Sequence, residues 1–175
     1  EAARVSALRG HKVTIYEKNV LGGGLIPASV TKYKADIHNL INYYKAQMEK
    51  LNIKVVYEEA TPDLIANQQY DEAIIAVGKI PKPLAIKGIE KPSTFRAIDV
   101  LANKVETGKN VIIVGGGLTG IETAIFLADQ GRKVTVIEQT DEIMKNDLIT
   151  FKMSYVEKLL EKNIKVYIST SLKEA

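Results

Sequence analysis

Glycine spacing marks the part of this sequence best suited to binding chemistry. Gly115, Gly117 and Gly120 follow the apolar run NVIIV and lead into a helical pattern. In such a context the first glycine allows a tight turn, the second lets the backbone approach a pyrophosphate, and the third permits close packing of helix on strand. A helix that begins near Leu118 would direct its unpaired N–H groups and positive dipole end at the phosphates. We therefore predict a dinucleotide-binding loop that includes Leu118 and Thr119.

An acidic residue lies where such a loop requires one. Glu138 follows Gly120 by 18 residues and ends the next apolar run, KVTVIE. A carboxylate at this position accepts hydrogen bonds from the hydroxyls of the adenosine ribose and repels a 2′-phosphate. Asp141 and Glu142, which we expect at the surface, would add to that repulsion. The pattern therefore favours NADH over NADPH.

The elements that must position these residues alternate between strand and helix, which is typical of an α/β protein. Val- and Ile-rich runs predict buried parallel strands at 12–17, 72–78 and 110–117. Further strands follow helical segments at 52–57, 133–138 and 165–170. Apolar residues at three- and four-residue spacing predict helices at 35–51, 121–130 and 155–162. The predicted fold class is α/β, a Rossmann-like dinucleotide-binding fold in which helices flank a parallel sheet.

The sequence repeats itself at an offset of 121 residues, between 1–17 and 122–138. The repeat makes Glu17 the counterpart of Glu138 and predicts that it binds the ribose of a second dinucleotide. Only the later copy is preceded by a strand and glycine loop, so we expect a fragment of a longer protein, cut inside its first nucleotide-binding unit. We expect 1–81 to form a partial first domain, 82–108 a linker, and 109–175 the second domain, truncated at its C-terminus.

Two further segments of the first domain point to backbone close to a ligand. Gly22, Gly23 and Gly24 follow Glu17 closely and could let the chain pass beside a cofactor. The predicted strand at 72–78 ends at Gly78 and leads through Pro81 and Pro83 into the linker.

Composition excludes several classes of function. The chain has 175 residues, no Cys and a formal charge of +3, which leaves no disulfide, Cys-ligated metal or Cys nucleophile and no strongly basic surface. No apolar stretch approaches the roughly 18 residues that span a bilayer, and the first residues are not a secretory signal. We expect a cytoplasmic protein with no nucleic-acid or membrane partner. His38 has no acid or Cys at metal-ligand spacing, and we expect no metal and no catalytic residue in this chain.

Together these residues resemble the two-dinucleotide flavoprotein superfamily, in which an NAD(P)H-binding unit is inserted into an FAD-binding unit. YDEAIIAVG at 70–78 is similar to the superfamily's second FAD motif, with Val77 in place of Thr. GLTGIETAIFLADQGRKVTVIEQTDEI, AIDVLANKVETGKNVIIVGGG and INYYKAQMEKLNIKV narrow the resemblance. They are similar to the C-terminal FAD/NAD(P)-binding region of the NADH:flavin oxidoreductases of the enoate reductase and 2,4-dienoyl-CoA reductase type. The resemblance covers essentially the whole chain.

The resemblance also implies roles for individual residues. The implied FAD contacts are Glu17 and Lys18 on the ribose and adenine side, Ala60 at the adenine, Gly22 and Gly23 beside the flavin, and Ala76, Val77 and Gly78 at the pyrophosphate. Gly24 stands where the family usually has Gln. Glu122 would lie near the nicotinamide end of NADH. Alternatively, it is a carboxylate early in a helix that complements the helix dipole.

The implied function is that of an electron-entry module, which takes hydride from NADH to FAD. Electrons would pass on through an iron–sulfur cluster and FMN to an activated C=C bond of an enoate or enoyl-CoA. FMN and the cluster would belong to the remainder of the same polypeptide, which carries a flavin barrel domain. We expect the isolated chain to be inactive, to bind FAD poorly and to bind NADH weakly.

Two other interpretations stay open. One is an NAD(P)H:FAD module like the small subunit of glutamate synthase, whose dithiol lies outside this region. The other is a structural ADP-binding module, as in the amine dehydrogenases. A thioredoxin-reductase-like enzyme is disfavoured because no Cys precedes the second glycine motif.

Overall fold

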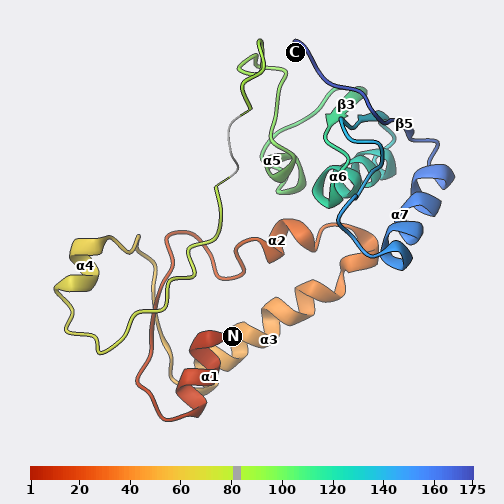
Figure 1. The fold of residues 1–175 in the computed structure, drawn as a ribbon. Helices are drawn as coiled ribbons and strands as arrows, with labels where there is room; N and C mark the ends of the chain where they lie inside the picture. Colours follow the sequence, from red (N-terminus) through yellow and green to blue (C-terminus); the bar gives the residue numbers. More distant parts are fainter. Residues whose placement is uncertain (81–83) are drawn as a thin grey trace. The chain divides into compact units, whose positions relative to one another are not determined.

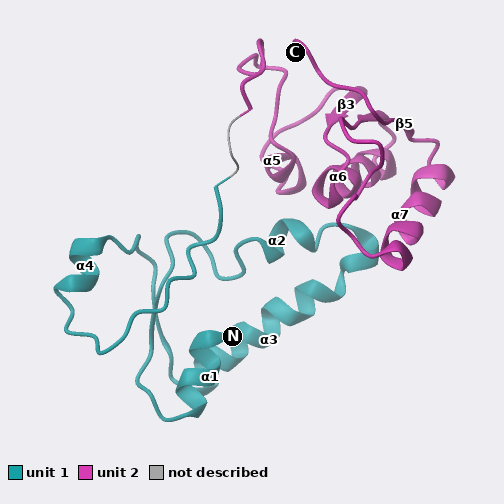
Figure 2. Cartoon of the chain, viewed as in Figure 1, with its two compact units in different colours: residues 1–81 teal, residues 82–175 magenta. Residues whose placement is uncertain are grey.

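The computed structural model describes residues 1–80 and 84–175. The chain divides into two compact units, residues 1–81 and 82–175 (Figure 2). The boundary expected between residues 81 and 82, together with Pro81 and Pro83, lies outside the described residues.

Unit 1 contains one long helix, α3 (Figure 1), and a pair of parallel strands. Its elements are α1 (Ala2–Leu8), β1 (Thr14–Tyr16), α2 (Leu25–Ala28), the 3-10 turn η1 (Lys32–Lys34), α3 (Asp36–Lys50), β2 (Lys54–Val56) and α4 (Pro62–Ala66). Strands β1 and β2 pair in parallel, with Ile15 opposite Val55. The apolar stripe predicted at 35–51 forms α3, which buries Ile41 and Met48.

The prediction of a strand at 72–78 is wrong. The structure has no strand there, and the apolar side chains of the segment are exposed, Ile75 to 84%. A buried strand needs a hydrogen-bonded neighbour and a layer that covers its side chains. Within the described residues the sheet of unit 1 ends at β1 and β2, and neither pairs with this segment. The apolar run alone was therefore not sufficient to make a strand.

Unit 2 has a three-stranded parallel sheet in the order β3–β4–β5. Its elements are α5 (Ala97–Leu101), β3 (Asn110–Val114), α6 (Leu118–Asp129), β4 (Lys133–Ile137), α7 (Ile149–Glu161) and β5 (Lys165–Tyr167). In register, Ile112 lies opposite Thr135, and Val136 opposite Val166. The α/β class with parallel strands flanked by helices is confirmed. Helix α7 begins six residues before the predicted start at 155.

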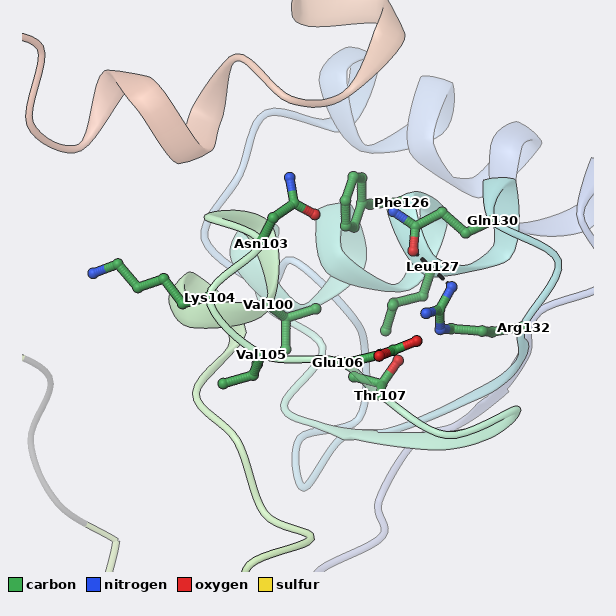
Figure 3. Close-up of a pocket in the computed structure, with 10 residues that line it drawn as sticks. All are labelled: Val100, Asn103, Lys104, Val105, Glu106, Thr107, Phe126, Leu127, Gln130 and Arg132. Carbon is green, nitrogen blue, oxygen red and sulfur yellow. Dashed lines mark hydrogen bonds between the residues drawn. The ribbon is translucent and has the colours of Figure 1, made fainter.

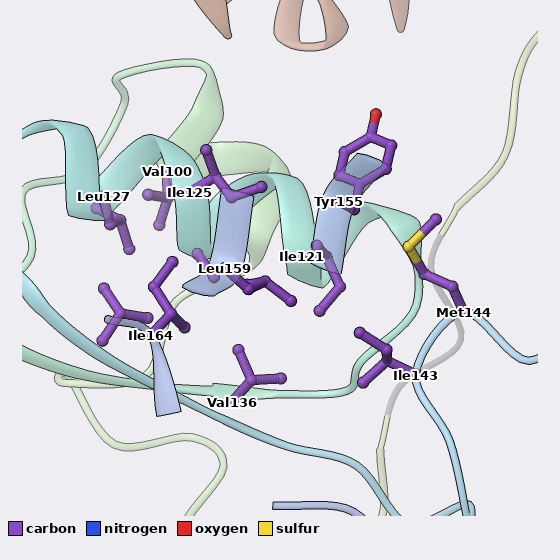
Figure 4. Packing of buried hydrophobic residues seen from close by; sticks show 12 residues of the cluster. Val100, Ile121, Ile125, Leu127, Val136, Ile143, Met144, Tyr155, Leu159 and Ile164 are labelled. Carbon is purple, nitrogen blue, oxygen red and sulfur yellow. The ribbon is translucent and has the colours of Figure 1, made fainter. Parts of the chain in front are cut away.

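The core of unit 2 lies between its sheet and α6 and α7 (Figure 4). Ile121 and Ile125 on α6 are fully buried above Val136 of β4, and Leu159 of α7 joins them. Each such side chain contributes about 1.5–3 kcal/mol of burial free energy. The prediction that β3 is a buried strand is only half right, because its burial alternates along the strand and Ile112 is 64% exposed. The packed helices cover one face of the sheet, and the apolar run does not reveal that the other face is open.

The predicted repeat is visible in hydrogen bonds that end equivalent helices. Gly10 and Gly131 both have left-handed backbone, φ 89° and 79°. The Gly10 N–H donates to the Ala7 carbonyl, and the Gly131 N–H to the Ala128 carbonyl (3.0 and 2.9 Å). Asn52 and Asn163 end α3 and α7 in the same way, each with φ 52°. Both caps turn the chain directly into the next strand.

Two negative findings concern the described residues only. Within 1–80 and 84–175, no helix has the length and apolar character needed to cross a membrane. In the same ranges, His, Cys, Asp and Glu side chains do not gather in any group of three or more that could hold a metal ion.

Candidate nucleotide-binding site

The glycine loop lies at the carboxyl end of β3, where ligands of parallel α/β sheets bind. Gly115 has φ 108°, a backbone conformation that L side chains rarely adopt, and its N–H donates to the Ile137 carbonyl (2.9 Å). Gly117 caps α6, which begins at Leu118 as the sequence predicted. A Cβ on Gly120 would lie 2.0 Å from the Gly115 carbonyl oxygen. Close approach of helix to strand therefore requires glycine at position 120.

The surface above Gly117 is open. A Cβ on Gly117 would meet no atom within 4 Å, whereas a Cβ on the adjacent Gly116 would clash with Ile143. The free backbone N–H groups of the first turn of α6 follow directly after Gly117. This combination fits a pyrophosphate that approaches the backbone at residue 117.

Gly116 is a further constrained glycine, which the spacing of the other three did not indicate. A Cβ there would lie 2.8 Å from Ile143 Cγ2 and 3.0 Å from Glu138 Cβ. Its N–H donates to Glu138 Oε2 (2.6 Å), and its carbonyl accepts from the Met144 N–H (2.9 Å). The segment after β4 therefore packs against the glycine loop and hydrogen-bonds its backbone at Gly116. The only sequence signal was that three glycines stand in a row.

Glu138 directs its carboxylate into this loop rather than into solvent. Besides Gly116, the N–H and the hydroxyl of Thr140 bond Glu138 Oε1 (2.7 and 2.8 Å). The Thr140 N–H is the main cause of a lowered Glu138 pKa, which desolvation opposes and the Gly116 N–H reinforces. The carboxylate is thus held charged beside the glycine loop, at the position predicted for a ribose contact.

The acidic residues after Glu138 hold nearby lysines. Asp141 forms an ion pair with Lys145 (2.8 Å), and Glu142 bonds Lys152 of α7. The Asp141–Lys145 pair lowers the Asp141 pKa and raises the Lys145 pKa. Asp141 is exposed as expected, but neither acid is a mere solvated charge.

Glu122 is buried between α6 and α7. It is only 6% exposed, and the Tyr155 hydroxyl donates to its Oε1 (2.7 Å). Thr119, in the first turn of the helix, accepts a hydrogen bond at its carbonyl from the Thr123 hydroxyl (2.7 Å). The contact between Glu122 and Tyr155 joins residues 33 positions apart, so the sequence pattern gave no sign of it.

In unit 1 the structure brings some of the predicted FAD contacts together. Glu17 accepts from the Asn19 N–H (2.9 Å), and Lys18 forms an ion pair with Glu59 (3.0 Å), which places the chain before Ala60 beside Lys18. Gly22 and Gly23 have left-handed backbone, φ 122° and 45°. A Cβ on Gly22 would lie 3.0 Å from Ile26 Cγ1, whereas Gly23 and Gly24 face open space.

The other predicted FAD contacts lie in the extended segment of unit 1. Ala76, Val77 and Gly78 are exposed, and Gly78 has φ 78°. Their assignment to a pyrophosphate remains a prediction.

A separate pocket of about 360 Å³ lies near the amino ends of β3 and β4, at the opposite end of these strands from the glycine loop (Figure 3). Its residues precede β3 and β4 or belong to the last turns of α6, among them Thr107, Phe126 and Arg132. Gln130 accepts a hydrogen bond from Arg132 Nη1 (2.7 Å). Because the strands are parallel, this pocket faces away from the glycine loop and is not the nucleotide site.

The fold and this loop define a dinucleotide-binding module, and comparison with known proteins gives its family. Residues 1–175 match the family model described as pyridine nucleotide-disulphide oxidoreductase, so the chain belongs to this family. The chain itself has no Cys. The part of the name that refers to disulphide chemistry therefore has no counterpart among these residues.

Several of the similar proteins are named as reductases. Cinnamate reductase of Clostridium sporogenes is 40% identical over 147 residues, which cover 83% of this chain and 22% of the relative. Bilirubin reductase of Mediterraneibacter gnavus is 32% identical over 174 residues, 98% of this chain and 27% of the relative. A solved 2-naphthoyl-CoA reductase complex matches with a TM-score of 0.92 and 34% identity, over 98% of this chain and 26% of that one.

These comparisons confirm the predicted resemblance to enoate-type reductases. The chain is a pyridine-nucleotide- and FAD-binding module of that kind, and it spans about a quarter of the length of the relatives that it matches.

Proposed function

We propose that unit 2 binds NADH and that unit 1 contributes to an FAD site, so that the chain admits electrons to a larger flavin-dependent reductase. The observation that carries the proposal is the Glu138 carboxylate, which hydrogen-bonds the Gly116 N–H within the glycine loop. A loop for a pyrophosphate and a fixed acid for a ribose are the two parts of a dinucleotide site.

Two features of unit 2 suit a dinucleotide, an open approach to the start of α6 and an acid beside the glycine loop. Gly117 leaves the approach to α6 open, and the free N–H groups of its first turn complement phosphate charge. Glu138 Oε2 accepts the Gly116 N–H, and we expect a ribose hydroxyl to be a further donor to this carboxylate. When bound, NADH supplies a hydride and FAD accepts it; the chain binds and orients the two.

For the second nucleotide, Glu17 and Lys18 follow β1 as Glu138 follows β4. Glu17 already accepts a backbone N–H from the turn after the strand, as Glu138 does. This likeness supports a ribose contact at Glu17 and FAD as the nucleotide of unit 1.

The names of the relatives favour a substrate with a conjugated double bond. Cinnamate is an unsaturated acid, and 2-naphthoyl-CoA is an aromatic acyl thioester. We propose that electrons leave FAD through an iron–sulfur cluster and FMN in the rest of the polypeptide and reduce such a bond in an enoate or enoyl-CoA. The site of reduction would then lie outside these 175 residues.

A calorimetric titration of the purified chain with NADH, NADPH and ADP in parallel tests the proposal. We expect NADH to bind more tightly than NADPH and Glu138→Arg to abolish that preference. Glu157→Arg, the same change at an exposed site on α7, serves as the control and should leave the preference intact.

Binding of ADP with no binding of either reduced nucleotide would contradict electron entry. It would favour a structural nucleotide site of the amine-dehydrogenase type. A folded chain that binds none of the three would contradict the nucleotide site itself.

A further inference from the structure

The inference drawn here rests on the proposed NADH site and concerns how that site rejects NADPH. Thr140, two residues after Glu138, makes the largest number of hydrogen bonds to its carboxylate. Both the N–H and the hydroxyl of Thr140 bond Glu138 Oε1, at 2.7 and 2.8 Å, whereas Oε2 receives the Gly116 N–H.

This arrangement makes the two carboxylate oxygens unequal. A carboxylate oxygen has two lone-pair sites. Both donors of Thr140 lie on Oε1, whereas Oε2 accepts the Gly116 N–H and lies beside the glycine loop. The pair of bonds from Thr140 therefore fixes the rotation of the carboxylate and presents Oε2 to a ribose hydroxyl.

Thr140 is itself held in place from two sides. Its hydroxyl has one hydrogen, which is shared between Glu138 Oε1 and the Glu142 carbonyl oxygen (2.8 and 2.7 Å). The Thr140 carbonyl accepts the Ser169 N–H from the segment after β5 (2.8 Å). The Glu138 backbone is held by the same segment, because its N–H donates to the Tyr167 carbonyl and its carbonyl accepts from the Thr170 N–H (both 2.8 Å). Neither partner can turn without breaking these bonds.

The first two lysines that follow Glu138 in the sequence are also engaged in ion pairs. A 2′-phosphate needs a cation with free donors. Lys145 is paired with Asp141 and Lys152 with Glu142, both acids of the segment that follows Glu138. A phosphate on the ribose would therefore meet a fixed negative charge and would have to compete with carboxylates for either ammonium group.

We propose that Thr140 is a positioning residue for Glu138, and that Thr140 together with the Asp141–Lys145 ion pair makes segment 138–145 the element that selects a nucleotide with a free 2′-hydroxyl. Glu138 supplies the charge, Thr140 its orientation, and Asp141 the neutralisation of the adjacent cation.

The test measures the dissociation constants of NADH and NADPH for the purified chain and its variants. Thr140→Val keeps the shape and the backbone N–H but removes the hydroxyl. We expect it to weaken NADH binding about tenfold, the factor expected for one lost hydrogen bond to a charged group, and to lower the preference for NADH. Thr140→Ser should restore the preference. Thr150→Val, the same change at an exposed position in the first turn of α7, is the control.

Asp141→Asn tests the ion pair separately. It frees the Lys145 ammonium group and should tighten NADPH binding several-fold, an effect that salt should weaken because the new contact is exposed. Thermal unfolding of each variant shows whether it is folded.

The outcomes separate this inference from the proposed function. If the wild-type chain prefers NADH but folded Thr140→Val keeps the same ratio of dissociation constants, the role of Thr140 is wrong and the NADH site stands. If Thr140→Ser behaves like Thr140→Val, the hydroxyl is not the group responsible. If the wild-type chain binds neither nucleotide, the proposed function fails, and selection fails with it.

Discussion

The Tyr155 hydroxyl donates a 2.7 Å hydrogen bond to Glu122 Oε1, and both residues are buried. This bond joins α7 to α6 near the start of α6, the helix that follows the glycine loop. A carboxylate in such surroundings is costly to desolvate unless its oxygens are bonded, so the tyrosine helps to keep Glu122 in the interior.

Tyr155→Phe should therefore destabilise unit 2. The change leaves the ring and its edge-to-face packing on Phe151 in place but removes one donor from the buried carboxylate. We expect a loss of about 1–3 kcal/mol in the free energy of unfolding, measured by urea denaturation. Tyr167→Phe, at a half-exposed ring on β5, should change stability by far less. Equal effects of the two substitutions would show that the bond to Glu122 contributes nothing.

The glycines at 117 and 120 should respond differently to the same substitution. Gly120→Ala places a Cβ 2.0 Å from the Gly115 carbonyl oxygen, so we expect the loop to shift and unit 2 to lose several kcal/mol of stability, on the order of a strained buried site. Gly117→Ala adds a methyl group in open space, so stability should stay within about 1 kcal/mol. That methyl group would nevertheless occupy the approach of the pyrophosphate and weaken NADH binding.

Circular dichroism melts and NADH titrations measure the two effects. Gly108→Ala, which also faces open space but lies before β3, serves as the control for both. Unchanged NADH affinity in Gly117→Ala would place the pyrophosphate elsewhere.

Stability should depend on pH through Glu138. Its pKa is lowered in the folded chain, mainly by the Thr140 N–H, from an ordinary value of 4.5. A lowered folded pKa means that the unfolded chain takes up the proton first. The stabilisation is therefore fully present above pH 4.5 and is lost as the pH falls through the lowered value.

Unfolding curves of the wild-type chain and Glu138→Gln, recorded from neutral pH downward, check this expectation. The difference in unfolding free energy between them should be largest near neutrality and shrink on acidification below the ordinary carboxylate range. A difference that stays constant throughout would show that the carboxylate charge is not what the loop stabilises.

The two faces of the unit 2 sheet should also differ in their sensitivity to truncation. Ile125→Ala removes a fully buried side chain from the layer between α6 and the sheet, and should cost about 2–5 kcal/mol in unfolding free energy. Ile112→Ala, on the open face of β3, should cost much less because its side chain is 64% exposed. Comparable losses in urea denaturation would indicate that the open face is covered in solution.

The local features of this chain were predictable from sequence. The glycine spacing located the turn at Gly115 and the start of α6, because only glycine tolerates that backbone and that proximity. The helical periodicity located α3 within a residue at each end. The repeat located equivalent helix ends at Gly10 and Gly131.

Features that depend on partners distant in sequence were not predictable. The apolar run at 72–78 has the composition of a strand but no hydrogen-bonded neighbour. The bond from Tyr155 to Glu122 and the packing that demands glycine at 116 depend on how α7 and the segment after β4 fold back. The sequence does not mark Thr140 either, because a hydroxyl two residues from an acid has no signature of its own.

The matched helix ends show which parts of the architecture are free to vary in length. Gly131 stands 121 residues after Gly10, whereas Asn163 stands 111 residues after Asn52. The first copy therefore holds ten more residues between its two caps than the second. The helices nevertheless end alike, because the Asn52 and Asn163 N–H groups each donate to the carbonyl three residues earlier (3.1 and 3.0 Å). The difference is absorbed largely in the connection between strand and helix. For protein engineering this makes the connection between β4 and α7, beyond residue 145, a suitable place to insert a tag or a sensor peptide, because longer loops add little entropic cost.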